Sequence, residues 1–170
     1  MATNRIFEAN LFTPAGQWLG KAKEVVLPEI TAMTTDYEGL GSNGKKQYFT
    51  GFEAMEGSVT WNSVITDAWR ETAVMNSVVP IMVRANMESH DEEGLDSEVP
   101  VVYYLNVMFK SLALGSFKSQ EQTEHAQNFA VYSIKMEVDG TEEFYLDTSA
   151  QIYRVGGVDQ IATRNANLGI

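Results

Sequence analysis

Chain length and composition indicate a single folded domain. The 170 residues include 44% apolar and 21% charged residues, a balance that excludes global disorder. A chain of this length buries about 70% of its unfolded surface, so we expect one core over residues 1–170. The net charge is −11, and Lys45 and Lys46 form the only adjacent basic pair. Because binding to a phosphate backbone needs clustered Lys and Arg, this charge excludes a dedicated nucleic-acid-binding surface.

The chain contains no cysteine, which excludes disulfide frameworks and thiolate metal sites. Residues 1–12 lack the charged start and the continuous apolar stretch of a secretory signal. The longest apolar run, residues 99–105, is interrupted by Pro100 and is too short to cross a bilayer. We therefore expect a protein that is made in the cytoplasm and does not bind membranes.

Strands dominate the elements predicted in the first half of the chain. Residues 21–33, 55–62 and 79–87 combine apolar alternation with strand-forming residue types. The residues predicted to face the core from the last two strands are Val59, Trp61, Ile81, Val83 and Ala85.

One segment between these strands has helical spacing instead. Its apolar positions recur at steps of three and four residues, while Asp67 and Glu71 lie toward solvent. This pattern predicts a helix of about three turns over residues 64–75. The residues on its apolar face are Ile65, Ala68, Trp69 and Thr72.

The strongest predicted strand is residues 101–109, in which every odd-numbered residue is apolar. Its even-numbered positions change from Val102 and Tyr104 to Asn106 and Lys110. This second face is too apolar for a bare monomer, so we expect it to be partly covered.

A hairpin is predicted next. Residues 130–138 alternate in polarity and are followed by the turn signal Asp139-Gly140 and a second strand over residues 141–146. The residues predicted to point inward from the first strand are Ala130, Tyr132, Ile134, Met136 and Val138.

Together these elements predict a mainly β fold: a β-sandwich or barrel of two packed antiparallel sheets with one flanking α-helix. Two excursions, residues 36–49 and 89–99, interrupt the strands and are expected to be long loops. Such loops in a compact domain are usually mobile or used for contacts.

A glycine-rich stretch at residues 39–44 matches G-x-G-x-x-G, and Lys45 extends it toward a phosphate-binding loop. Both motifs work only between a strand and a helix whose N–H groups face the phosphate. The continuation, residues 45–51, is aromatic and β-prone. We therefore expect a flexible loop, with no nucleotide or other cofactor.

Metal ligands are not expected. His90 and His125, the only histidines, lie in acidic or polar neighbourhoods without converging partners, so exposed side chains are predicted. The acidic residues at 91–98 lack the ligand spacing of a calcium-binding loop, which favours a solvated or contact loop.

The three tryptophans raise the possibility of a carbohydrate platform. Trp61 and Trp69 fall on apolar faces and are expected in the core, which leaves Trp18 for such a role. No arrangement of Ser, His and Asp and no identifiable carboxylate pair supports catalysis, so an enzyme is not expected.

Both ends of the chain carry a family resemblance. The segments 10–12 (NLF), 20–28 (GKAKEVVLP) and 37–41 (YEGLG) resemble the opening of the major tail tube proteins of contractile-tailed phages and R-type bacteriocins. The ending, through 155–160 (VGGVDQ) and 164–170 (RNANLGI), is similar as well. Order and total length also agree, whereas the middle of the chain is similar mainly in its strand rhythm.

This resemblance implies a structural virion protein, assembled in the host cytoplasm, whose hexameric rings stack into the inner tail tube. It implies sheath, baseplate and tape-measure proteins as partners, and DNA as passing cargo during ejection. The residues expected in a loop that reaches the neighbouring ring are Tyr37, Glu38, Gly39, Gly41, Asn43, Gly44, Lys45 and Lys46. The residues expected in terminal contacts between subunits are Asn10, Phe12, Asp159, Arg164 and Asn167.

The residues themselves fit a tube, because ring closure covers sheet edges and an acidic bore would not retain a polyanion. Two other classes remain open at this point. One is a monomeric β-sandwich module that recognises carbohydrate or protein through Trp18 and the long loops. The other is an enzyme that uses the glycine-rich loop and would be stabilised by nucleotide.

Overall fold

Residues 3–41 and 43–170, which the computed structural model describes, form twelve strands and two short helices. Met1, Ala2 and Ser42, the last within the predicted inter-ring loop, lie outside the described residues. The strands are β1 (Thr3–Thr13), β2 (Gly16–Gln17), β3 (Ala22–Val26), β4 (Ala32–Tyr37), β5 (Lys46–Phe52), β6 (Met55–Trp61), β7 (Val78–Asp91), β8 (Gly94–Phe109), β9 (His125–Val138), β10 (Thr141–Asp147), β11 (Ile152–Val155) and β12 (Val158–Asp159). The helices are α1 (Thr66–Thr72) and α2 (Ala162–Leu168).

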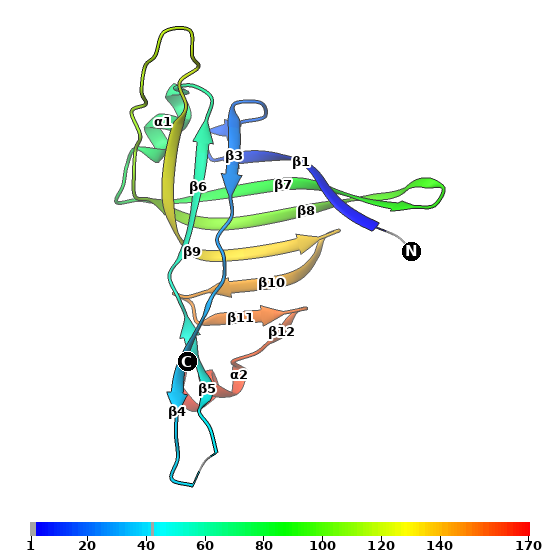
Figure 1. The fold of residues 1–170 in the computed structure, drawn as a ribbon, viewed down its shortest axis with the longest axis vertical. Coiled ribbons are helices and arrows are strands. Elements are labelled where there is room, and N and C mark those ends of the chain that lie inside the picture. The colour runs from blue at the N-terminus through cyan, green and yellow to red at the C-terminus, as the bar shows by residue number, and fades with distance from the viewer. Residues whose placement is uncertain (1–2, 42) are drawn as a thin grey trace.

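The main sheet is antiparallel and runs in the order β12-β11-β10-β9-β8-β7-β1-β2. A second layer, β3 and β6, joins it through β9, because residues 125–131 of β9 pair with β6 and residues 129–138 pair with β8. Figure 1 shows β9 beginning beside β6 and then bending to lie between β8 and β10. The predicted two antiparallel sheets with a flanking helix are confirmed.

The core lies between these two layers and under α1. Phe109 of β8 packs edge-to-face against Phe129 of β9, with ring centroids 5.6 Å apart. Leu105 and Val107 extend the same buried row along β8. Each such side chain contributes roughly 1.5–3 kcal/mol of burial free energy. The odd-numbered face predicted for residues 101–109 is therefore the core face.

The prediction for β9 is wrong in its first half. The side chains buried there are Phe129, Val131 and Ser133, followed directly by Ile134. The cause is a β-bulge, since Asn106 pairs with Ser133 while the next residue of β8 pairs with Val131. One extra residue in a strand reverses which positions face inward.

The predicted strand over residues 21–33 is interrupted. β3 ends at Val26, and β4 starts only at Ala32, so the five residues between them belong to neither sheet. Pro28 lies in this gap, and proline cannot donate a ladder hydrogen bond. The interruption lets the chain leave the body of the protein and enter a separate hairpin.

The predicted helix is confirmed in position as α1, which buries Ala68 and Thr72, but it is shorter than the three turns predicted over residues 64–75, because it spans only Thr66–Thr72. The second helix, α2, was not predicted from the sequence because none of its side chains is buried. It ends at Gly169, whose φ of 75° fits the left-handed C-cap that glycine favours.

Candidate assembly surfaces

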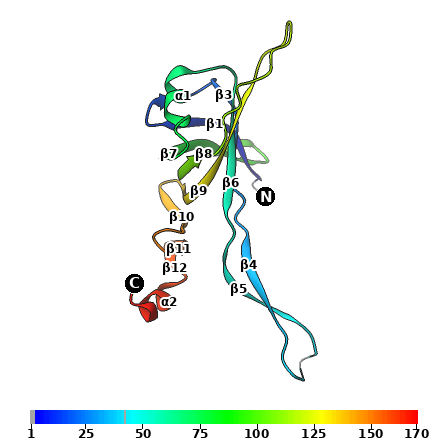
Figure 2. The same cartoon turned by 90° about the vertical axis from the view of Figure 1, so that its left-hand side faces the viewer.

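The β4–β5 arm, residues 32–52, is a separate two-stranded sheet that projects below the body (Figures 1 and 2). The predicted loop over residues 36–49 is thus a hairpin: β4 runs through Tyr37, β5 begins at Lys46, and residues 38–41 and 43–45 belong to the tip. An isolated two-stranded hairpin is only marginally stable in water. The arm therefore has the features of an element that gains stability by contacting something else.

The arm exposes large aromatic side chains along its length. Tyr37, Tyr48 and Phe49 are each at least half exposed, and the two tyrosine rings touch with centroids 5.7 Å apart. They form an apolar surface suited to a protein partner.

An aromatic ladder attaches the arm to the main sheet. Phe52 lies 5.1 Å from Phe49 and 4.9 Å from Tyr153, and Tyr153 in turn lies 6.1 Å from Phe144 (centroid distances). The ladder connects β5 to β11 and β10, so it fixes the direction in which the arm leaves the body.

The glycine-rich stretch serves the turn at the arm tip. Gly41 and Gly44 have φ values of 81° and 154°, which L side chains rarely adopt. The element that follows the stretch is the strand β5, whereas a phosphate-binding loop leads into the N-terminus of a helix, so the order of elements differs from that of the motif. Lys45 Nζ lies 3.7 Å from Glu38 Oε2 across the tip.

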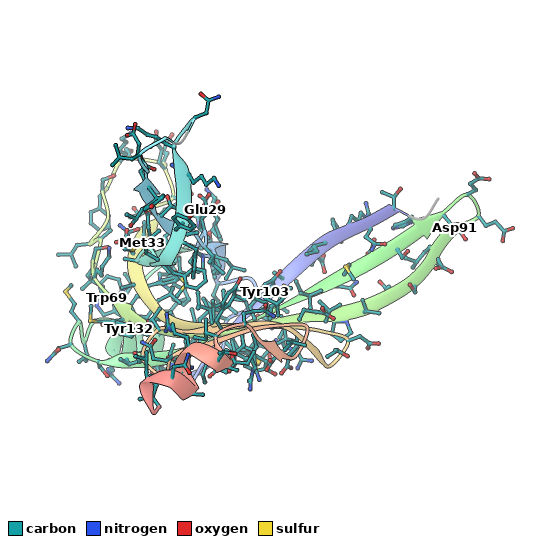
Figure 3. The ribbon with its side chains drawn as sticks, turned by 90° about the horizontal axis from the view of Figure 1, so that it is seen from below. Glu29, Met33, Trp69, Asp91, Tyr103 and Tyr132 are labelled. Carbon is teal, nitrogen blue, oxygen red and sulfur yellow. The ribbon has the colours of Figure 1, made fainter. Side chains whose placement is uncertain are left out.

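A second arm is built by the far ends of β7 and β8 together with the start of β1. The predicted loop over residues 89–99 is wrong, because β7 continues to Asp91 and β8 starts at Gly94. Asp91 Oδ1 accepts hydrogen bonds from the N–H groups of Glu93 (2.8 Å) and Gly94 (3.1 Å) and so closes the turn. Figure 3 places Asp91 at the far end of this arm, away from Tyr103 in the body.

One ion cluster stiffens the β7–β8 arm. Glu88 accepts a hydrogen bond from Arg5 Nε at 2.8 Å and contacts His90 Nε2 at 3.0 Å. The pKa of Glu88 is held below its ordinary value, mainly by the hydrogen bond with His90 and to a smaller extent by the hydrogen bond from Arg5. His90 is thus half-buried and partnered, in contrast to the predicted exposed side chain.

The other predicted exposed histidine, His125, is buried. Its ring packs edge-to-face against Trp69 of α1 at 5.8 Å, and its Nδ1 lies 3.2 Å from the Ala113 carbonyl oxygen. Pairing of β9 with β6 carries this residue under the helix, which sequence spacing does not reveal. Among the described residues, no group of three or more His, Cys, Asp or Glu could hold a metal ion.

Trp18 is not available as a carbohydrate platform. Its side chain is only 5% exposed, its Nε1 donates to Thr13 Oγ1 at 2.8 Å, and its ring packs against Trp61 at 6.1 Å. Trp61 is buried as predicted, whereas Trp69 is half-buried against His125.

The predicted terminal contact residues lie at opposite edges of the main sheet. Asn10 and Phe12 belong to β1, near one edge, while Asp159 belongs to β12 at the other. Arg164 and Asn167 lie on α2, where Arg164 Nη2 donates to Gln151 Oε1 at 2.6 Å. The two groups do not meet within one chain.

A hollow of about 540 Å³ on the outer face of the main sheet was missed by the sequence reasoning. Lys135 lies over the Tyr104 ring and Arg154 over the Tyr145 ring, at 4.7 and 4.9 Å from the centroids. Glu137 pairs with Lys135 at 2.8 Å and raises the pKa of that lysine. The residues that line the hollow come from β1, β7, β8, β9, β10 and β11, so no local sequence motif indicates the hollow. The one signal in the sequence is the apolar Tyr104 on the even face of β8, which is exposed.

None of the described helices has the length and apolar character needed to cross a membrane.

Comparisons with known proteins agree with this architecture. The chain is 29% identical to the tail tube protein of Escherichia phage P2 over 167 residues, which cover 95% of this chain and 94% of that protein. In fold it is similar to a chain of the PVC sheath–tube complex, an extracellular contractile injection system, with a TM-score of 0.56, 10% identity, and coverage of 78% of this chain and 90% of that one. A chain of the tube-terminating cap of the anti-feeding prophage gives a TM-score of 0.56 and 14% identity, with coverage of 76% and 87%.

The model of the family described as phage tail tube protein FII matches residues 3–169, nearly the whole chain. The chain therefore belongs to the phage tail tube protein FII family and is a structural component of the virion tail.

Proposed function

We propose that six copies of this chain close into a ring, and that rings stack head to tail into the inner tube of a contractile tail. The observation that carries the proposal is the pair of arms. Each projects from the body in a different direction and presents surface that its own chain leaves uncovered. The β4–β5 arm follows the long axis of the chain and suits contacts between rings, whereas the β7–β8 arm, which carries the start of the β1 edge, suits contacts within a ring.

Contacts within a ring are assigned to the edges of the main sheet. Edge strands with unpaired backbone groups tend to associate, and closure into a ring removes them. The β1 edge carries Asn10 and Phe12, and the β12 edge with α2 carries Asp159, Arg164 and Asn167. Because these edges are opposite, the same two surfaces meet at every subunit boundary of a closed ring.

Contacts between rings are assigned to the β4–β5 arm. A heterologous contact that does not close on itself generates a filament, and a projecting hairpin is such a contact. The arm tip, with Gly39, Asn43 and Lys45, would be the first part to reach the next ring.

Partners follow from the tube. The PVC relative belongs to a sheath–tube complex, which supports a sheath around this tube as well. Baseplate and tape-measure proteins would limit the tube at its end and along its length. DNA would pass through the bore as cargo, and the net charge of −11 favours passage without adhesion. The proposed role requires no catalytic chemistry.

Electron microscopy of the purified protein at high concentration tests the proposal. We expect rings and hollow rods, and we expect that added nucleotide leaves the thermal unfolding temperature unchanged. A protein that stays monomeric at every concentration and salt condition, or that nucleotide stabilises, contradicts the tube.

The assignment of the β4–β5 arm has its own test. Deletion of residues 38–46 is expected to leave a folded chain that forms rings but no long rods, because the deleted segment is only the arm tip and the first residue of β5. Circular dichroism checks the fold and microscopy checks the rods. Normal rods from the deletion variant would remove this role from the arm.

The acidic bore is tested after the tube structure identifies its lining. Replacing lining Asp and Glu residues with Lys is expected to slow DNA ejection while tubes still form, since attraction at each ring would retain the DNA. Unchanged ejection from such tubes would show that the charge has no part in DNA passage.

A further inference from the structure

The 110–124 loop joins β8 to β9 and projects beyond the body at the end of the molecule opposite the β4–β5 arm. In Figure 1 the loop is at the top and the arm at the bottom, along the longest axis, and Figure 2 shows the same separation after a quarter turn. The two projections therefore mark the two ends of the chain's long dimension.

Hydrogen bonds hold the 110–124 loop in one shape. Thr123 Oγ1 donates to the Ser116 carbonyl oxygen at 3.1 Å, and Ala113 N–H donates to the Ala126 carbonyl oxygen at 3.2 Å. Gly115 has a φ of 86°, and a Cβ at this position would lie 2.6 Å from Thr123 Cγ2. A loop that is already ordered loses little conformational entropy when it binds a partner.

This ordered loop nevertheless presents apolar side chains to solvent. Leu114 is 70% exposed and Phe117 is 83% exposed. At the other end of the molecule, the arm exposes Leu40 fully and Tyr37 and Tyr48 by more than half. Each end thus offers apolar surface without an intramolecular cover.

Charge supports a match between these two ends. Residues 36–46 contain two acidic residues and two lysines, a net charge of zero, and residues 110–124 contain two lysines and two glutamates, again zero. The whole chain carries −11, so these ends are neutral parts of a strongly acidic molecule. Both hold a Lys–Glu pair, Lys45 with Glu38 (3.7 Å) and Lys118 with Glu121 (3.4 Å), and such pairs can exchange partners across a contact.

We propose that the β4–β5 arm of one copy packs on Leu114 and Phe117 of the 110–124 loop of the next copy along the tube. The inference rests on the proposed stacking and adds the surface that receives the arm. Translation along the long axis brings the lower end of one chain to the upper end of the next, which is the heterologous geometry of a filament. Burial of the exposed rings on both sides supplies the driving force.

The absence of cysteine makes a direct cross-linking test possible. Asn43→Cys at the arm tip and Ser116→Cys in the loop leave the apolar side chains intact, and the two variants are mixed before assembly. With a short bismaleimide linker, we expect a cross-linked dimer containing one chain of each variant. Ser149→Cys, at an exposed position between β10 and β11, replaces the loop variant as the matched control and should give no such dimer with Asn43→Cys.

A substitution pair tests the energetics. Leu114→Ser with Phe117→Ser is expected to abolish long rods while rings and the thermal unfolding temperature remain, whereas Leu114→Met with Phe117→Tyr should restore the rods. Two results would overturn the inference without contradicting the proposed tube. One is rods of the mixed cysteine variants that give no cross-linked dimer, and the other is long rods from the double serine variant. If the double serine variant forms rods that do not bind the sheath protein, the 110–124 loop contacts the sheath and does not receive the arm. Absence of wild-type rods would refute the proposed function itself.

Discussion

Gln127 is fully buried at the junction between β9 and the helix α1. Its Oε1 accepts a hydrogen bond from Trp61 Nε1 at 2.8 Å, and its Nε2 donates to Thr72 Oγ1 at 3.1 Å. Thr72 Oγ1 donates in turn to the Ala68 carbonyl oxygen at 2.9 Å. This chain of bonds ties a strand of the second layer to the helix, and it satisfies polar atoms that would be costly to bury unpaired.

We predict that Gln127→Met lowers the free energy of unfolding by about 1–3 kcal/mol, because the similar volume is kept while the Trp61 N–H loses its acceptor. Chemical denaturation measures the change. Gln17→Met, on the exposed strand β2, is the control and should shift stability by less than about 0.5 kcal/mol. An equal loss for both variants would show that the buried network contributes nothing specific.

The Glu88 cluster gives a pH-dependent prediction. Its lowered pKa means that the folded state favours the carboxylate, so its stabilisation is complete above the ordinary carboxyl pKa and is lost as pH falls through the folded value. We therefore expect Glu88→Gln to unfold at a lower temperature than the wild type at neutral pH, and the gap to narrow below about pH 4. Glu92→Gln, at the exposed turn of the same arm, controls for the loss of one charge. A gap that stays constant down to strong acid would contradict the assignment.

At the scale of elements, sequence patterns predicted those strands that bury one face. β6, β7 and β8 alternate because Val59, Ile81 and Leu105 enter the core while their neighbours do not. The arms lack this signal, since within one chain both faces of residues 32–37 and 46–50 and most of residues 91–100 are exposed. The acidic residues near Asp91 have low strand propensity, so their pairing depends on the hairpin and on β1.

The other features that the sequence patterns did not predict depend on contacts between residues far apart in the chain. The β9 bulge is set by pairing with Asn106 and Val107, and the burial of His125 is set by α1, so neither is encoded in local spacing. The same holds for the outer hollow around Tyr104, whose lining comes from six strands. By contrast, the Asp139-Gly140 turn is purely local, with φ values of 49° and 76°, and its prediction is confirmed.

Close packing around Gly57 of β6 leads to a third prediction. A Cβ there would lie 2.5 Å from the Val26 carbonyl oxygen and 2.6 Å from Phe129 Cε2. We expect Gly57→Ala to destabilise the protein by about 1–3 kcal/mol, because β3 and the core ring must both shift. Gly51→Ala in β5 is the matched control, since no described atom lies within 4 Å of its Cβ position. Thermal unfolding is measured for both variants. Similar melting temperatures would show that β3 and the Phe129 ring can move at little cost.

At the scale of the whole molecule, charge opposes association while apolar surface favours it. Copies that each carry −11 repel one another at low salt, and about 0.15 M salt shortens this repulsion to roughly 8 Å. The neutral ends of the long axis allow contact where repulsion is weakest.

We therefore predict that the protein concentration needed for rods falls as ionic strength rises from about 10 mM to about 150 mM. Light scattering and sedimentation at a series of concentrations measure it. If rods dissolve as salt is added, attractive ion pairs between copies drive assembly. That result would contradict the prediction that charge opposes association.

The chain's two extremities are unlike: a hairpin at one and a short looped segment at the other. Any polymer built from it by axial repetition has a polarity, so its two tips are chemically different growing points. A copy that keeps the looped extremity but lacks the hairpin would add to one tip and offer nothing to the following copy. A small fraction of such copies would then end the growth of rods and reduce their mean length.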